Sequence, residues 1–158
     1  MTTFRYSEPA RGRRPRRRAR ACRSLKIVLS GLPPETHAWN LVALQLIMEG
    51  MGHEVVNLGA GADVARVLAA CRRERPDCLV LSTVTGRGQE EAARVISRVR
   101  ADPALAGLTA VLGGRLGAGG DPRAELLGLG FDEVFHVDSA DTGKAVASLR
   151  EFVSTRAC

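Results

Sequence analysis

The chain carries a histidine and a carboxylate two residues apart in the loop Pro33-Pro34-Glu35-Thr36-His37-Ala38. Imidazole is the commonest metal-ligating side chain, and a carboxylate that accepts its second N–H fixes the tautomer and basicity of the ring. The loop follows an apolar segment, residues 25–29, that has the composition of a β-strand. Because ligands of open α/β sheets bind beyond the carboxyl ends of the strands, His37 is a candidate metal ligand and Glu35 its candidate partner.

Apolar strand patterns alternate with helical patterns from residue 25 onward. The predicted strands cover residues 25–30, 53–58, 77–82, 108–112 and 133–137, and the predicted helices cover 38–51, 62–73, 89–100, 122–129 and 142–153. Five β-α repeats predict an α/β fold of the flavodoxin-like type: a doubly wound, five-stranded parallel sheet of order 2-1-3-4-5 in a Rossmann-like three-layer arrangement. The switch point then lies between the first and third strands, so the loops after Ser30 and Ser82 form its crevice.

The basic character of the chain is confined to its first residues. The chain has 158 residues and a net charge of +6, but residues 1–24 hold nine arginines and one acid, and the remainder is slightly acidic. A segment so rich in like charges cannot bury apolar surface. We therefore expect a disordered arginine-rich tail over residues 1–24, one domain over residues 25–154 and a C-terminal tail over residues 155–158.

The composition also limits partners and compartment. An arginine-rich arm could bind nucleic acid or an acidic partner, but a tail without such a role is the preferred interpretation, and no nucleic-acid partner is expected. No apolar run approaches the roughly 20 residues of a membrane helix, and no apolar core of a secretory signal is present. We expect a cytoplasmic protein without membrane association.

The cysteines match no zinc or redox spacing. Cys71 falls in a helical pattern and Cys78 begins a strand, so both are expected to be small core residues. The spacing of the four cysteines, which include Cys22 and Cys158, does not require a disulfide.

Three functions common in such folds are excluded by the residues. A phosphoacceptor receiver needs an aspartate at the end of the third strand, where this chain has Leu81-Ser82-Thr83. A flavin-phosphate loop needs N–H donors after the first strand, where prolines remove them. A dinucleotide fingerprint needs G-x-G-x-x-G, and the glycine-rich run 113–120 has another spacing after the fourth strand.

Three segments in order match a known pattern. They are Glu35-Thr36-His37-Ala38-Trp39-Asn40, Ser82-Thr83-Val84-Thr85-Gly86 and Gly113-Gly114. Together they resemble the base-off/His-on cobalamin-binding domain, whose pattern is D-x-H-x-x-G, then S-x-L, then G-G. The likeness is strongest to the small-subunit family of glutamate mutase (methylaspartate mutase), which also has segments like Val55-Val56-Asn57-Leu58-Gly59 and Gly86-Arg87-Gly88. The resemblance implies that residues 25–154 form a cobalamin-binding domain.

The resemblance implies a role for each motif residue. His37 would replace dimethylbenzimidazole as the lower cobalt ligand, and Glu35 would accept the other imidazole N–H. Ser82 would bind the base of the displaced nucleotide tail, Val84 would wall its slot, and the glycines would let backbone approach its ribose and phosphate. The cofactor-binding residues implied are Pro34, Glu35, Thr36, His37, Ala38, Gly59, Ser82, Thr83, Val84, Gly113, Gly114, Arg115, Leu116 and Gly117, with His37 as the metal ligand.

The chain departs from the pattern at three positions. Glu35 replaces an aspartate, Val84 a leucine and Asn40 a glycine. The last replacement matters most, because that glycine lets the start of the helix pass close to the corrin.

The implied function is that of the cobalamin-binding subunit of an adenosylcobalamin-dependent carbon-skeleton mutase, an isomerase. The chain offers no substrate cluster and so no catalytic residue of its own; a separate large barrel subunit would supply the substrate site, in a heterotetramer. One alternative is a non-catalytic corrinoid-binding module, either a methyl carrier or the partner of another B12 enzyme. Methyl carriers usually have a helical bundle before the domain, which residues 1–24 cannot form. Another alternative is a cobalamin-free regulatory protein whose basic arm binds nucleic acid.

Overall fold

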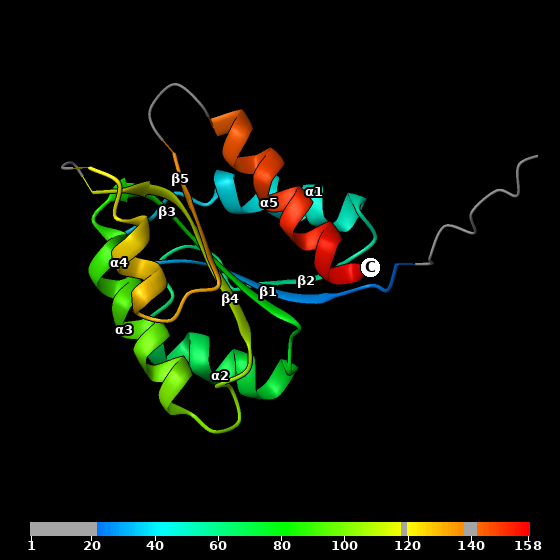
Figure 1. The fold of residues 1–158 in the computed structure, drawn as a ribbon, viewed down its shortest axis with the longest axis horizontal. Coiled ribbons are helices and arrows are strands. Elements are labelled where there is room, and N and C mark those ends of the chain that lie inside the picture. The colour runs from blue at the N-terminus through cyan, green and yellow to red at the C-terminus, as the bar shows by residue number, and fades with distance from the viewer. Residues whose placement is uncertain (1–21, 118–119, 138–141) are drawn as a thin grey trace, which may run out of the picture.

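A five-stranded parallel sheet organises the chain (Figure 1). The computed structural model describes residues 22–117, 120–137 and 142–158. The sheet order is β2-β1-β3-β4-β5, which confirms the predicted flavodoxin-like topology. The strands are β1 (Lys26–Gly31), β2 (Glu54–Asn57), β3 (Cys78–Gly86), β4 (Thr109–Leu116) and β5 (Glu133–His136). The helices are α1 (Trp39–Gly50), α2 (Val64–Glu74), α3 (Gly88–Ala101), α4 (Arg123–Gly128) and α5 (Thr142–Ala157).

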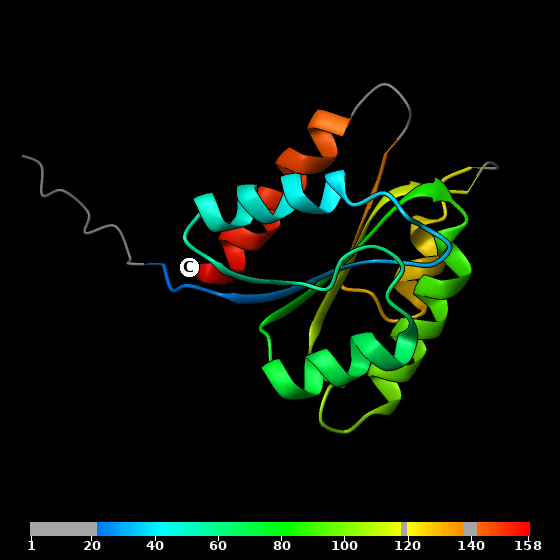
Figure 2. The ribbon, with the colours of Figure 1, turned by 180° about the vertical axis from the view of Figure 1, so that it is seen from behind.

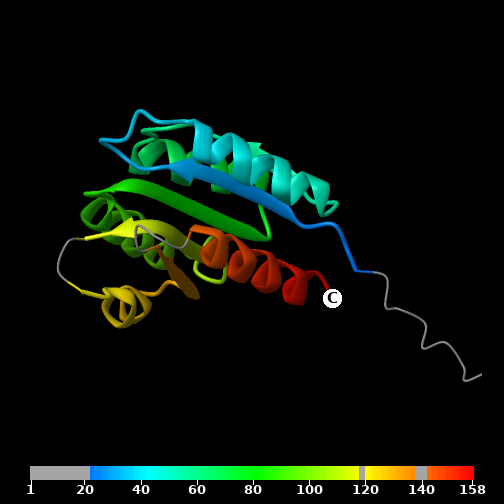
Figure 3. The same cartoon turned by 90° about the horizontal axis from the view of Figure 1, so that it is seen from above.

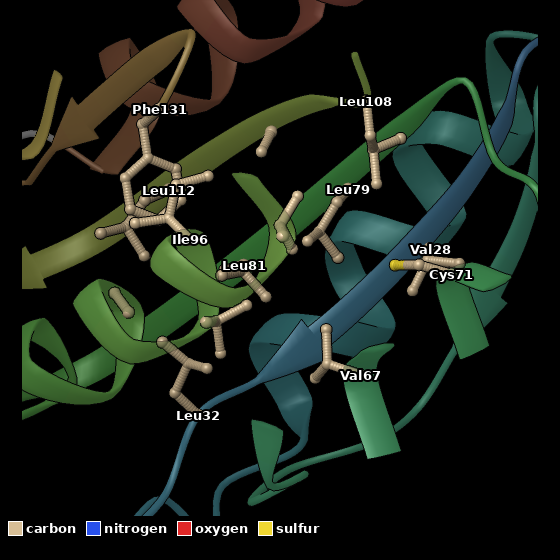
Figure 4. Packing of buried hydrophobic residues seen from close by; sticks show 14 of the residues in the cluster. Val28, Leu32, Val67, Cys71, Leu79, Leu81, Ile96, Leu108, Leu112 and Phe131 are labelled. Carbon is tan, nitrogen blue, oxygen red and sulfur yellow. The ribbon is translucent and has the colours of Figure 1, made fainter. Parts of the chain in front are cut away.

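The helices cover both faces of the sheet. Helices α1 and α5 lie on one face, and α2, α3 and α4 lie on the other (Figures 2 and 3). Each face has its own apolar cluster, because side chains alternate along a strand: Val28 and Leu79 pack toward α2 and α3, whereas Ile27 and Val80 pack toward α1 and α5. Figure 4 shows the first of these clusters. Burial on both faces explains why β1 and the first half of β3 are almost continuously apolar.

Two strands are longer than the sequence predicts, and both extend at the carboxyl edge. Strand β3 continues to Gly86 and β4 to Leu116, whereas the apolar runs end at residues 82 and 112. The extensions pair with each other, Ser82 with Gly113 and Thr83 with Gly114, up to a register shift before Gly86. The motif segments expected in loops therefore lie side by side within the sheet.

The two ends of the described chain are joined. Cys22 and Cys158 form a disulfide, which the cysteine spacing did not predict, and the Arg23 amide donates to the Ala157 carbonyl at 2.9 Å. Helix α5 continues to Ala157, through most of the segment expected to be a C-terminal tail. Residues 1–21, which make up most of the expected arginine-rich tail, lie outside the described residues.

The other two cysteines have the predicted environment. Cys71 and Cys78 are free thiols buried in the two cores. Burial raises the pKa of the Cys71 thiol to about 11 and that of the Cys78 thiol to about 12, so both stay protonated and unreactive at neutral pH.

Within the described residues, no helix has the length and apolarity that crossing a membrane requires.

Candidate ligand-binding site

The loop between β1 and α1 holds His37 at the carboxyl edge of the sheet. Leu32, fully buried, anchors the start of the loop, and its carbonyl accepts a hydrogen bond from the Glu35 amide at 3.0 Å. The chain then turns outward, and His37 is exposed two residues before α1 begins. The imidazole is therefore free to meet a ligand approaching this edge.

The carboxylate of Glu35 is buried and faces the end of β3. Its side chain is 3 % exposed, and both of its oxygens lie within 3.2 Å of the Val84 amide nitrogen, which donates to them. Burial raises the pKa of the Glu35 carboxyl, while the Val84 hydrogen bond and the nearby His37 charge oppose that rise. No hydrogen bond joins Glu35 to His37 among the described residues. The carboxylate thus fixes the His37 loop to β3.

A cavity of about 360 Å³ lies between the sheet, α1 and α5, and we call it the α1–α5 cavity. Its volume is within the range of small-molecule sites. Apolar side chains make most of its wall, and the polar residues gather at the strand ends. The lining residues are Asn40, Ala43, Leu44, Ile47, Val80, Leu81, Ser82, Thr83, Val84, Val111, Gly113, Gly114, Arg115, Phe135, Val137, Thr142, Ala145, Val146 and Leu149.

Two residues from different elements form a hydrogen bond in the wall of this cavity. Asn40, in the first turn of α1, donates from Nδ2 to the Ser82 hydroxyl at 2.9 Å. The amide Oδ1 of Asn40 is enclosed and has no hydrogen-bond partner within the described part of the chain. Unpaired enclosed acceptors are rare in proteins, so the wall carries capacity for a polar group of a ligand.

The structure brings together six of the predicted site residues. The residues at the ends of β3 and β4 that line the α1–α5 cavity are Ser82, Thr83, Val84, Gly113, Gly114 and Arg115. Four others lie with His37 on the neighbouring loop: Pro34, Glu35, Thr36 and Ala38.

Three predicted residues lie outside the cavity lining. Gly59 follows β2, where its carbonyl accepts a hydrogen bond from the Gly31 amide. Leu116 is buried in the core on the opposite face of the sheet. Gly117 follows β4, where an added Cβ would approach the Gln89 side chain.

The helical side of the cavity was not predicted as part of the site. Residues 40, 43, 44 and 47 of α1 and residues 142, 145, 146 and 149 of α5 line the cavity. Both sets have the i, i+3, i+4, i+7 spacing of one helix face. The same spacing describes a helix packed on a core, so the pattern alone does not distinguish a cavity wall from a filled interface.

Comparison with known proteins agrees with this geometry. The profile of the B12 binding domain family matches residues 17–147. A glutamate mutase sigma subunit 2 from Haloarcula marismortui is 23% identical over 128 residues, covering 78% of this chain and 84% of that protein.

Among solved structures, a cobalamin-binding protein from Desulfitobacterium hafniense has a TM-score of 0.63 and 19% identity, over 82% of this chain and 59% of that one. The methanol:cobalamin methyltransferase complex from Methanosarcina barkeri has a TM-score of 0.60 and 17% identity, over 82% of this chain and 46% of the other. A chemotaxis response regulator from Vibrio cholerae has a TM-score of 0.60 and 14% identity, over 82% of this chain and 99% of the other. These structural likenesses establish the fold.

The fold and site define a flavodoxin-like domain with a ligand cavity at the carboxyl edge of its sheet. The family match covers most of the chain, and the chain belongs to the B12-binding domain family. Within that family it is similar to a glutamate mutase sigma subunit.

The residues present fit a cobalamin. Among the described residues no cluster of three or more His, Cys, Asp and Glu could hold a bare metal ion. A corrin brings four equatorial nitrogens of its own, so its cobalt needs a single imidazole from the protein, and His37 is exposed at the edge of the sheet. The apolar cavity with the unpartnered Asn40 Oδ1 offers space and polarity for a heterocyclic nucleotide tail.

Proposed function

We propose that the chain is the cobalamin-binding subunit of an adenosylcobalamin-dependent carbon-skeleton mutase of the glutamate mutase kind. The observation that carries the proposal is that the α1–α5 cavity and the exposed His37 lie at the same carboxyl edge of the sheet. In this proposal His37 is the lower cobalt ligand, and the nucleotide tail enters the cavity with its base displaced from cobalt.

The chain's own residues bind and orient the cofactor. The buried Glu35 carboxylate ties the His37 loop to the Val84 amide, which limits where the imidazole can lie. Ser82 presents a hydroxyl to the tail, and Gly113 widens the cavity because it has no Cβ. Arg115, exposed where β4 meets the cavity, supplies a positive charge for the phosphate of the tail.

The reaction needs a second polypeptide. When bound, adenosylcobalamin would supply the radical chemistry that a 1,2-rearrangement of a substrate acid needs. His37 faces solvent at the carboxyl edge of the sheet, which leaves the space above it open to a partner. We therefore propose a large catalytic subunit that covers this edge, excludes water and carries the substrate site, in a heterotetramer.

Titration of the purified chain with adenosylcobalamin tests the binding part of the proposal. We expect the absorption spectrum to change to that of the base-off form, and His37→Ala to abolish that change. His53→Asn is the matched control, because His53 lies before β2 at the other edge of the sheet. An unaltered spectrum with the wild-type chain would rule the proposal out.

Mixing with a glutamate mutase large subunit tests the enzymatic part. We expect neither protein alone to isomerise glutamate, and the mixture with adenosylcobalamin to do so. Cobalamin binding without activity in any such mixture would favour the alternative, a corrinoid-binding module that serves another enzyme.

A further inference from the structure

Asn40 occupies the position where the cobalamin-binding pattern has a glycine, and its side chain is part of the cavity wall. Its amide Nδ2 donates to Ser82 Oγ at 2.9 Å, which joins the first turn of α1 to the end of β3. Ser82 is 5 % exposed, so water does not freely compete for its hydroxyl.

The hydrogen bond determines what the Ser82 hydroxyl can do. A hydroxyl has one proton to donate and two lone pairs that accept. Because Asn40 donates to the oxygen, the proton of Ser82 is left for another acceptor, and none is found within residues 22–117, 120–137 and 142–158. The enclosed Asn40 Oδ1 also has no partner in that part of the chain. The pair therefore offers one donor and one acceptor at the cavity wall.

We propose that Asn40 is a positioning residue that makes Ser82 a hydrogen-bond donor to a heterocyclic ring nitrogen in the α1–α5 cavity. This inference rests on the proposed cobalamin function and gives a role to a residue that departs from the family pattern. Asn40 acts through Ser82 because its Nδ2 occupies an acceptor site of the hydroxyl and so directs the free proton elsewhere. The ligand class that fits is an aromatic base with an exposed lone pair, such as the displaced benzimidazole of the nucleotide tail.

The substitutions Asn40→Ala and Asn40→Asp separate this role from a purely steric one. Alanine removes the donor and leaves the Ser82 proton free to turn elsewhere, so we expect cobalamin affinity to fall about 3- to 10-fold. Aspartate has nearly the shape of asparagine, but its carboxylate accepts and would take the Ser82 proton for itself. We expect Asn40→Asp to bind cobalamin about 10- to 100-fold more weakly than the wild type, and so more weakly than Asn40→Ala. If Asn40 acted only through its shape, Asn40→Asp would bind cobalamin more tightly than Asn40→Ala.

The experiment is a cobalamin titration followed by absorption at pH 7.5, with circular dichroism to verify that each variant is folded. The set is Asn40→Ala, Asn40→Asp, Ser82→Ala and the double variant Asn40→Ala/Ser82→Ala. Val42→Ala is the matched control, because Val42 is exposed on the same helix and does not line the cavity. In the Ser82→Ala background the Asn40→Ala effect should shrink to less than about 2-fold.

The outcomes distinguish this inference from the proposed function. A wild-type chain that does not bind cobalamin overturns the proposed function itself. A wild-type chain that binds, together with Asn40→Asp at or above the affinity of Asn40→Ala, or with effects of Asn40 and Ser82 that simply multiply, overturns the positioning role alone.

Discussion

His37 and Glu35 are two residues apart in sequence but have opposite environments. The imidazole is exposed, whereas the carboxylate is buried and receives the Val84 amide. The motif predicts a direct contact between the two side chains. The structure instead gives Glu35 a backbone partner on β3, so its effect on the imidazole is exerted through the loop and through charge.

The first prediction tests this anchoring role of Glu35. Glu35→Ala removes the acceptor of the Val84 N–H and frees the loop, so cobalamin affinity should fall on the order of 10- to 100-fold. Glu35→Gln keeps an acceptor of the same length and should lose less. Calorimetric titration of both variants measures the difference. Equal affinities for the wild type and Glu35→Ala would show that the carboxylate has no such role.

At the scale of elements, the paired ends of β3 and β4 bring the motif glycines into contact with the cavity. Gly114 has φ +123°, and a Cβ there would collide with the backbone carbonyl of Thr83. Gly113 differs, because its added Cβ would meet Phe135 at 3.8 Å, an ordinary contact. The fold therefore requires Gly114, whereas Gly113 leaves room in the cavity.

Alanine at each position should separate these two functions. Gly114→Ala should destabilise the domain by roughly 3–5 kcal/mol, since neither strand backbone can move away cheaply. Gly113→Ala should change stability by less than about 1 kcal/mol but weaken cobalamin binding about tenfold, because the methyl group narrows the cavity. Urea unfolding and cobalamin titration report the two quantities. Similar losses of stability in both variants would contradict the distinction.

The opposite edge of the sheet holds a buried histidine that should respond to pH. His53 Nδ1 accepts from the Leu25 amide, its Nε2 is enclosed without a partner in the described residues, and burial lowers its pKa. The folded state therefore binds this proton less readily than the unfolded state. Its contribution to stability is present above the unfolded pKa of about 6.5 and is lost as the pH falls through the lower folded pKa.

The substitution His53→Asn retains an acceptor for Leu25 without a titrating group. Between pH 7.5 and pH 5 the wild type should lose more stability than this variant, as measured by urea unfolding at each pH. Parallel losses in the two proteins would show that His53 does not titrate on unfolding.

The sequence predicts the elements of this domain well, because its strands are apolar on both faces and its helices have a clear period. It does not predict the lengths of β3 and β4. The extension of β4 begins with two glycines, which are rare in strands, and the β-branched residues Thr83, Val84 and Thr85 of β3 fall in a segment expected to be a motif loop in spite of their strand propensity. The cavity walls on α1 and α5 are missed for a related reason, because an apolar helix face is the same whether the space beneath it is filled or empty.

At the scale of the whole molecule, the Cys22–Cys158 disulfide joins residues 136 positions apart. It connects the segment before β1 to the end of α5, and α5 forms one wall of the cavity. A cross-link over so long a loop restricts the unfolded chain strongly. The sequence does not predict the pair, because cysteine spacing carries no information about which chain ends meet in space.

Breaking this cross-link should lower the stability of the domain. Cys158→Ser should reduce the free energy of unfolding by about 3–5 kcal/mol relative to the oxidised wild type, as expected for a loop of more than 100 residues. Dithiothreitol should reduce the stability of the wild type by a similar amount and leave the variant unchanged. Unfolding curves that coincide for all four samples would contradict a stabilising disulfide.

Electron paramagnetic resonance tests most directly whether His37 is the axial ligand of a bound cobalamin. The unpaired electron of cob(II)alamin couples to the nitrogen that occupies its lower axial position. With 15N-histidine incorporated into the chain, we predict that the triplet splitting from 14N becomes a doublet, and that His37→Ala abolishes the doublet while His53→Asn retains it. A triplet that persists in the labelled protein would contradict the account, because the axial nitrogen would then belong to the cofactor's own base.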